Sequence, residues 1–134
     1  MKLEIFTLCD SAADYQGKLC ILGAFDRVRV ETAPTTVAHC AVACRLRFHR
    51  IEEGEHKIRL TFADDDGKAV IKPIEASVSV KFGETTRSAM MNFVLHVNSL
   101  KLARFGEYTV DLAVDGVHLG SHPLYLDPPL REAQ

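Results

Sequence analysis

Apolar and polar residues alternate with a period of two over most of the chain, which is the pattern of β-strands with one buried face. From Ile74 to Phe82 every even position is apolar and most odd positions are polar. From Ala89 to Val97 every odd position is apolar. Both stretches are therefore predicted to be strands, separated by a turn at residues 83–87.

The same alternation predicts a β-hairpin near the C-terminus. Val110, Leu112 and Val114 alternate with polar or small residues, and Asp115-Gly116 follows, a pair that tolerates the positive φ of a tight two-residue turn. A turn centred on this pair places Val114 opposite Val117 and Leu112 opposite Leu119. Four apolar side chains would then share one face.

Tyr108 begins this hairpin within Gly106-Glu107-Tyr108. The position is typical of the tyrosine corner of immunoglobulin-like sandwiches, where a Tyr near the start of a strand hydrogen-bonds to backbone upstream. We therefore assign Tyr108 a structural role, together with Asp115 and Gly116.

Less regular alternation predicts further strands over residues 2–10, 18–30, 37–50, 56–64 and 68–72. In the second of these, Gly23 indicates either a bulge or a close approach of backbone. Residues 11–17 are predicted to form a loop, and residues 98–105 one short helical turn.

About eight or nine strands with no long amphipathic helix predict an all-β fold, specifically an immunoglobulin-like antiparallel β-sandwich. Residues 1–127 are expected to form a single sandwich domain and residues 128–134 a C-terminal tail.

Composition and charge exclude several function classes. A formal net charge of -2 gives no overall field that would attract nucleic acid or an anionic membrane, so neither is an expected partner. The apolar run Leu19–Phe25 is far shorter than the roughly 20 residues of a membrane-spanning helix. Glu4 and Asp10 interrupt the apolar core that a signal peptide requires, so the expected location is the cytoplasm.

Four cysteines lie in apolar surroundings and lack CxxC spacing: Cys9, Cys20, Cys40 and Cys44. The favoured interpretation is that they are small buried hydrophobic residues in reduced form. The alternative is a first hairpin centred between Asp14 and Tyr15, which would place Cys9 opposite Cys20 for a cross-strand disulfide.

Five basic residues are predicted to face outward on the hairpin centred on Glu53: Arg45, Arg47, His49, Lys57 and Arg59. This register places Arg47 opposite Arg59 and His49 opposite Lys57, so like charges would face each other at some cost in stability. One interpretation is a solvated face with acidic neighbours from other strands. The other is an interaction surface for an acidic partner.

Other candidate sites fit poorly. The acidic stretch Asp64-Asp65-Asp66-Gly67 suggests calcium, but an EF-hand loop counted from Phe62 has Phe as its first ligand and Pro73 as its twelfth. On a strand, Cys40 and Cys44 would be about 13 Å apart, too far for one zinc ion, and His118 and His122 have the same spacing. We expect no metal or cofactor, and no motif for a catalytic nucleophile is present.

Three stretches resemble a family of small uncharacterised bacterial proteins, known as a domain of unknown function. They begin at Met1, Arg45 and Leu102, and the most specific pieces are Phe6-x-Leu8-Cys9-Asp10 and Gly17-Lys18-Leu19 leading to Gly23-x-Phe25-Asp26. The resemblance implies a stand-alone bacterial sandwich domain and brings no catalytic residues with it.

The expected function is therefore a non-catalytic protein-interaction module, with a homo-oligomer or an unidentified protein as partner. Apolar residues on both faces of the first strand motivate self-association. A small-ligand or carbohydrate-binding sandwich is the alternative, and an enzyme of unrecognised type is the third.

Overall fold

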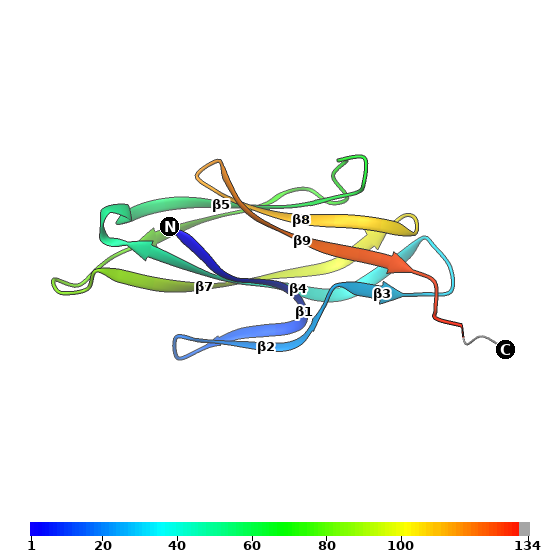
Figure 1. Ribbon diagram of the computed structural model, residues 1–134, viewed down its shortest axis with the longest axis horizontal. Coiled ribbons are helices and arrows are strands. Elements are labelled where there is room, and N and C mark those ends of the chain that lie inside the picture. The colour runs from blue at the N-terminus through cyan, green and yellow to red at the C-terminus, as the bar shows by residue number, and fades with distance from the viewer. Residues whose placement is uncertain (132–134) are drawn as a thin grey trace.

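Nine strands form two sheets in the computed structural model, which describes residues 1–131 (Figure 1). The four-stranded sheet contains β1 (Lys2–Tyr15), β2 (Lys18–Phe25), β4 (Thr35–His49) and β7 (Ser88–Leu102) in the order β2-β1-β4-β7. The five-stranded sheet contains β3 (Arg27–Arg29), β5 (Gly54–Ala63), β6 (Ile74–Val80), β8 (Gly106–Val114) and β9 (Val117–Asp127) in the order β3-β9-β8-β5-β6. The prediction of an all-β fold of about nine strands is confirmed.

One strand pair departs from the predicted antiparallel arrangement. β3 runs parallel to β9, with Val28 opposite Leu126, so the five-stranded sheet is mixed. The predicted strand over residues 18–30 is in fact two strands in different sheets, because the chain crosses between the sheets at Asp26, whose carbonyl accepts a hydrogen bond from Tyr125 N–H.

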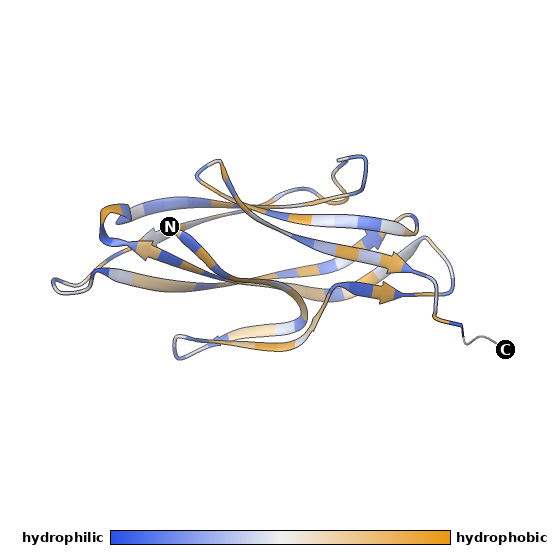
Figure 2. Ribbon diagram, viewed as in Figure 1, coloured by the Kyte–Doolittle hydropathy of each residue, from blue (hydrophilic) through white to orange (hydrophobic). Residues whose placement is uncertain are grey.

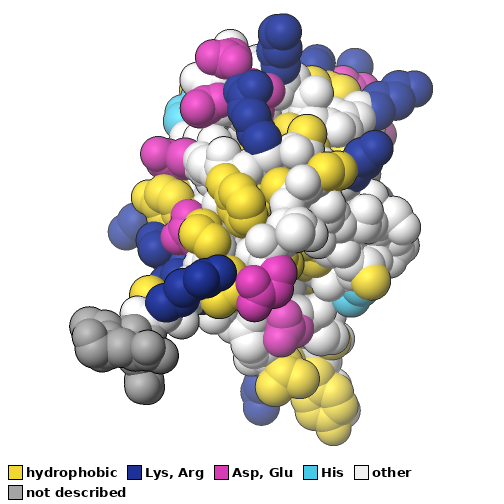
Figure 3. All heavy atoms as spheres, turned by 90° about the vertical axis from the view of Figure 1, so that its right-hand side faces the viewer, with side chains coloured by type: hydrophobic (Ala, Val, Ile, Leu, Met, Phe, Trp, Pro, Cys, Tyr) yellow, Lys and Arg dark blue, Asp and Glu magenta, His cyan; other side chains and the backbone are white. Residues whose placement is uncertain are grey.

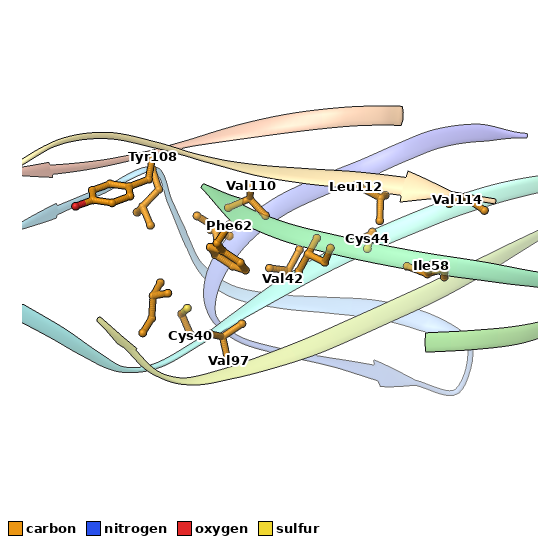
Figure 4. Packing of buried hydrophobic residues seen from close by; sticks show 14 of the residues in the cluster. Cys40, Val42, Cys44, Ile58, Phe62, Val97, Tyr108, Val110, Leu112 and Val114 are labelled. Carbon is orange, nitrogen blue, oxygen red and sulfur yellow. The ribbon is translucent and has the colours of Figure 1, made fainter. Parts of the chain in front are cut away.

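The main core fills the space between the sheets. Alternate residues of β4, from Val42 to Phe48, and of β5, from Ile58 to Phe62, are at most 1% exposed and pack against β8 (Figure 4). The predicted inward faces of these strands, and of residues 89–97, are confirmed.

Two connections differ from the sequence predictions. β4 and β5 do not form a hairpin, because the 3₁₀ turn η1 (Arg50–Glu52) carries the chain from one sheet to the other. Residues 98–102 continue β7 rather than forming a helical turn, and Ser99 takes a φ of 56° within that strand. In the predicted strand 68–72, only Ala69 pairs, in a single bridge to Ala63.

The C-terminal hairpin has the predicted turn but not the whole predicted register. Asp115 and Gly116 have φ values of 53° and 79°, and Val114 lies opposite Val117. A bulge beyond Ala113 then places Leu112 opposite Gly120 instead of Leu119. Val117 is 61% exposed, so the expected set of four apolar side chains on one buried face is wrong.

The first hairpin is longer than predicted and curls over the outer face of its own sheet. β1 continues through the expected loop to Tyr15, and the turn lies at Gln16 and Gly17. Asn92 of β7 donates hydrogen bonds to Asp14 Oδ2 and to the Gly17 carbonyl, both at 3.2 Å, which ties the tip of the hairpin across β4 to β7.

A second, smaller core lies beneath this curl. It consists of small side chains from β1 and β4, with partly buried Leu19 and Val94 packed against it: Cys9, Ala12, Ala41 and Ala43. Small side chains allow the hairpin to approach the sheet closely, which is why a face with little hydrophobic bulk is nevertheless buried.

Within the described residues, no helix is long and apolar enough to cross a membrane. Residues 128–131 of the predicted tail have no regular structure, and the rest of the tail lies outside the described residues.

Candidate functional site

The five basic residues predicted to share one surface are divided between the two sheets. Arg45, Arg47 and His49 belong to β4, whereas Lys57 and Arg59 belong to β5. The predicted pairs Arg47 with Arg59 and His49 with Lys57 are therefore wrong, because β4 pairs with β1 and β7 instead.

The arginines of β4 are matched by an acidic residue on the neighbouring strand. Glu4 of β1 accepts hydrogen bonds from Arg45 Nε and Arg47 Nε, both at 2.9 Å, and Arg47 Nη1 also donates to Ser88 Oγ at 3.2 Å. The hydrogen bond from Arg47 is the main cause that holds the pKa of Glu4 below its usual value. The two guanidinium groups thus share one carboxylate, as in a solvated charged face.

The other three residues have separate surroundings. Arg59 Nη1 donates to Glu75 on β6 at 3.3 Å. The backbone N–H of Lys57 donates to Asp115 Oδ1 at 2.8 Å, and the backbone N–H of His49 donates to Glu52 Oε1 at 2.9 Å. Residues Lys57, Arg59 and Glu75 also line a hollow on the five-stranded sheet.

The acidic turn is occupied by an arginine. Arg104 Nη2 lies 2.7 Å from Asp65 Oδ1, 2.9 Å from Asp66 Oδ2 and 3.7 Å from Asp64 Oδ2. The remaining oxygen of Asp64, Oδ1, accepts backbone hydrogen bonds from Asp66 and Lys68. The guanidinium therefore provides the positive charge that three adjacent carboxylates require.

Ser121, His118 and Asp111 meet on the C-terminal hairpin, which sequence analysis did not anticipate. His118 Nε2 lies 3.0 Å from Ser121 Oγ and 3.2 Å from Asp111 Oδ1, and the Ser121 hydroxyl donates to the same carboxylate oxygen. In a catalytic triad the imidazole lies between the other two groups and uses a different nitrogen for each. Here one nitrogen faces both groups, so the arrangement is not that of an activated nucleophile.

Buried thiols are also unsuited to nucleophilic chemistry. Burial raises the pKa of Cys40 to about 11 and that of Cys44 to about 12. Cys20 lies opposite Ala13 and Cys9 opposite Ala24, so the cross-strand pair considered for Cys9 and Cys20 is wrong. The turn lies two residues later in the chain than that alternative required.

The most unusual surface feature is β2, which is the end strand of its sheet. Between Lys18 and Asp26 its sequence is LCILGAF, without a charge or a proline. Leu22 is 70% exposed and Ile21 37%, and Tyr15 at the end of β1 is 61% exposed. Native edge strands are normally protected by charges, prolines or short length.

The figures locate this apolar edge along one side of the molecule. β2 lies along the lower side of the ribbon and is coloured mostly toward the hydrophobic end of the scale (Figures 1 and 2). In the space-filling view, hydrophobic side chains project at the lower end, where the β1–β2 hairpin lies (Figure 3). We refer to residues 19–25 as the β2 edge.

Gly23 shapes this edge through a close approach to β1. Its φ is 69°, and a Cβ at this position would lie 2.6 Å from Asp10 Oδ2. The pairing register is the same on both sides of it, Cys9 with Ala24 and Ser11 with Leu22. The unchanged register shows that Gly23 is not a bulge, and its close neighbour is the side chain of Asp10 rather than another stretch of backbone.

The other three sheet edges are less open to a partner strand. β6 presents Glu75, and β3 carries Arg27 and Arg29. β7 is the other edge of the four-stranded sheet and is also low in charge, but its large apolar side chains are at least partly buried. Among the described residues, the β2 edge thus combines an apolar sequence with exposure in a way that the other edges do not.

Residues 4–127 match the model of DUF6941, a family of unknown function. A search of curated proteins finds no match to the chain.

Proposed function

The chain belongs to the DUF6941 family of unknown function, and we propose that it is a non-catalytic protein-interaction module that binds an extended segment of polypeptide along the β2 edge. The observation that carries this proposal is the exposure of Leu22, at 70%, within the uncharged residues 19–25 of a strand at the end of a sheet. An end strand offers unpaired N–H and C=O groups, and an added strand pairs with them.

The surroundings of the β2 edge support a docking role. The hairpin is tied to β7 by Asn92 and rests on its own small core, so β2 is held in an extended, preformed conformation. A preformed edge loses little conformational entropy when a partner strand is added. Apolar side chains at positions 21 and 22 then supply affinity in addition to the backbone hydrogen bonds.

We also propose that the sandwich is of the immunoglobulin-like kind. Two features of the strand arrangement support this assignment: the neighbouring order β9-β8-β5-β6, which is that of strands G, F, C and C′, and the pairing of β4 with β7, which is that of B with E. Tyr108 near the start of β8 donates its hydroxyl to the Arg104 carbonyl at 2.6 Å, in the place of a tyrosine corner. In this scheme the β1–β2 hairpin is an addition beside strand B. An experimental structure in which β4 and β7 were not neighbours would overturn the assignment.

Selection from a library of displayed peptides tests the binding proposal. We expect wild-type protein to enrich peptides with apolar residues at alternate positions, and Leu22→Lys to lose them because a charge would be buried at the contact. Val117→Lys is the matched control, since Val117 is another exposed apolar side chain, at 61%, on the opposite sheet. Failure of the monomeric protein to enrich any peptide, or peptides that bind Leu22→Lys as well as wild type, would contradict the proposal.

A further inference from the structure

We infer that the strand bound by the β2 edge is β2 of a second copy of this chain, paired antiparallel about a two-fold axis at Leu22. This inference rests on the proposed function and names its partner. Three independent properties of residues 18–26 agree on this register: the directions of their backbone groups, the charges at their ends, and the exposure of their centre.

Backbone directions limit the registers that are available. The first hairpin closes with Tyr15 opposite Lys18 around a two-residue turn, Gln16 and Gly17, whose φ values are 51° and 79°. The two residues that flank such a turn each donate a backbone hydrogen bond to the other and accept one from it. Along the strand, residues bonded in this way alternate with residues whose backbone N–H and C=O groups point away from the partner strand. Lys18, Cys20 and Leu22 therefore direct their backbone groups toward β1, whereas Leu19 and Ile21 direct theirs away from the sheet.

A second β2 strand can pair only if its outward-directed residues meet those of the first. The register centred on Leu22 fulfils this condition, because it places Leu19 opposite Phe25 of the second copy and Ile21 opposite Gly23. Position 23 carries no side chain, so it leaves room beside the branched Ile21. The same pairs occur twice, as two-fold symmetry requires.

Charges at the two ends select this register among those allowed. Lys18 comes directly before the apolar run and Asp26 directly after it, and both are exposed. Centring on Leu22 places each Lys18 opposite Asp26 of the other copy. A shift of two residues places Lys18 opposite Ala24 or Val28 instead and removes both opposite-charge pairs, which stabilise antiparallel strands when directly opposed.

The centre of the pairing buries the most exposed large side chain of the edge. Leu22 would face Leu22 of the second copy at a non-hydrogen-bonded position, where Cα atoms approach to about 4.5 Å. Cys20 would lie opposite Ala24. The dimer thus joins two four-stranded sheets edge to edge into one continuous sheet and removes Leu22 from water.

Swapping the charges of Lys18 and Asp26 tests the register directly. We expect light scattering to show a concentration-dependent dimer for the wild-type protein. Lys18→Asp and Asp26→Lys should each weaken it about tenfold, since each substitution creates two like-charge contacts. The double variant carrying both substitutions should recover wild-type affinity, which general damage to the hairpin would not allow. A double variant no better than the singles would overturn the register.

Cross-linking gives a second measure that does not depend on charge. In a Cys20→Ser background, Leu22→Cys should form a disulfide-linked dimer under mild oxidation, because the Cα separation suits a disulfide. Val117→Cys in the same background is the control and should remain unlinked. A dimer formed through β7 would leave Leu22→Cys unlinked and the charge variants without effect, and would overturn this inference.

The outcomes separate this inference from the proposed function. A protein that stays monomeric but enriches extended peptides dependent on Leu22 retains the docking edge and loses the self-pairing. A monomer that enriches no peptides contradicts both.

Discussion

His56 of β5 and Asp115 of the C-terminal turn form a partly buried pair, with His56 Nδ1 2.6 Å from Asp115 Oδ2. The other ring nitrogen, Nε2, lies 2.5 Å from the Glu52 carbonyl. A carboxylate and a carbonyl only accept hydrogen bonds, so both contacts are made fully only when both nitrogens carry protons. The geometry therefore favours the charged imidazolium.

This pair predicts how stability varies with pH. Burial lowers the pKa of His56, but the hydrogen bonds and charges of Asp115 and Glu52 outweigh it and raise the pKa above the usual 6.5. The stabilisation is therefore complete below about pH 6.5 and is lost as the pH rises through the higher folded-state pKa. The pKa of Asp115 is lowered, chiefly by the Lys57 N–H, so its contribution is lost only as the pH falls below about 4.

Asp115→Asn isolates the charge. Asn still accepts the Lys57 N–H and tolerates positive φ in the turn, so the main loss should be the ion pair. We expect urea unfolding at pH 5.5 to show a loss of about 1 kcal/mol, limited by solvent screening because the Asp115 side chain is 42% exposed. The loss should shrink at pH 8.5. Glu75→Gln, in an exposed pair with Arg59, is the control, and an equal loss at both pH values would contradict the prediction.

Tyr108→Phe tests the tyrosine at the start of β8. The hydroxyl donates to the Arg104 carbonyl and accepts from its N–H at 3.2 Å, and the side chain is 3% exposed. Phe keeps the packing but leaves these backbone groups without their partner, so we expect a loss of about 1–2 kcal/mol in the free energy of unfolding. Tyr15→Phe, at an exposed tyrosine, should change stability by much less. Equal stabilities of Tyr108→Phe and wild type would show that the hydrogen bonds contribute nothing.

Sequence patterning predicted the strands whose two faces differ strongly in polarity. β6, β7 and β8 were located by strict alternation, and the Asp115-Gly116 turn by its residue types. These features are local, so they are readable from a few residues at a time.

Long-range features were not readable in the same way. Glu53-Gly54 has the composition of a hairpin turn, yet the chain changes sheets there, and this divides the basic residues of β4 from those of β5. Glu4, which binds two of those arginines, is 41 positions from Arg45. The β1–β2 hairpin was also not predicted in full. Residues 11–17, SAADYQG, are polar enough for a loop, and the pairing of this segment depends on a contact with Asn92 in β7. The apolar run Leu19–Phe25 was visible as a run, but only the strand order shows that it lies at an edge.

Asn92 is predicted to hold the first hairpin against β7. Asn92→Ala removes the hydrogen bonds to Asp14 and Gly17, so the hairpin tip should open more often. In a hydrogen-exchange measurement, we expect the backbone N–H groups of residues 12–21 that pair β1 with β2 to exchange with solvent several-fold faster. Exchange in β5 and β8 should change little. Asn98→Ala, which removes the contact with His39 at the far end of β7, is the matched control. Uniformly faster exchange over all strands would indicate global destabilisation instead.

The four thiols are predicted to differ sharply in reactivity. Cys20 is exposed, whereas Cys9, Cys40 and Cys44 are at most 1% exposed. Burial also raises the pKa of the three buried thiols, and only the thiolate reacts rapidly. With a chromogenic disulfide reagent at pH 8, we expect dilute native protein to release one equivalent of chromophore quickly. The other three equivalents should appear only when the protein unfolds. Cys20→Ser should remove the fast phase. At concentrations where β2 pairs with a second copy, the fast phase should slow, because Cys20 lies within the pairing. If the rate at which Cys20 reacts does not change over the range of protein concentration in which the dimer forms, the dimer interface does not include β2.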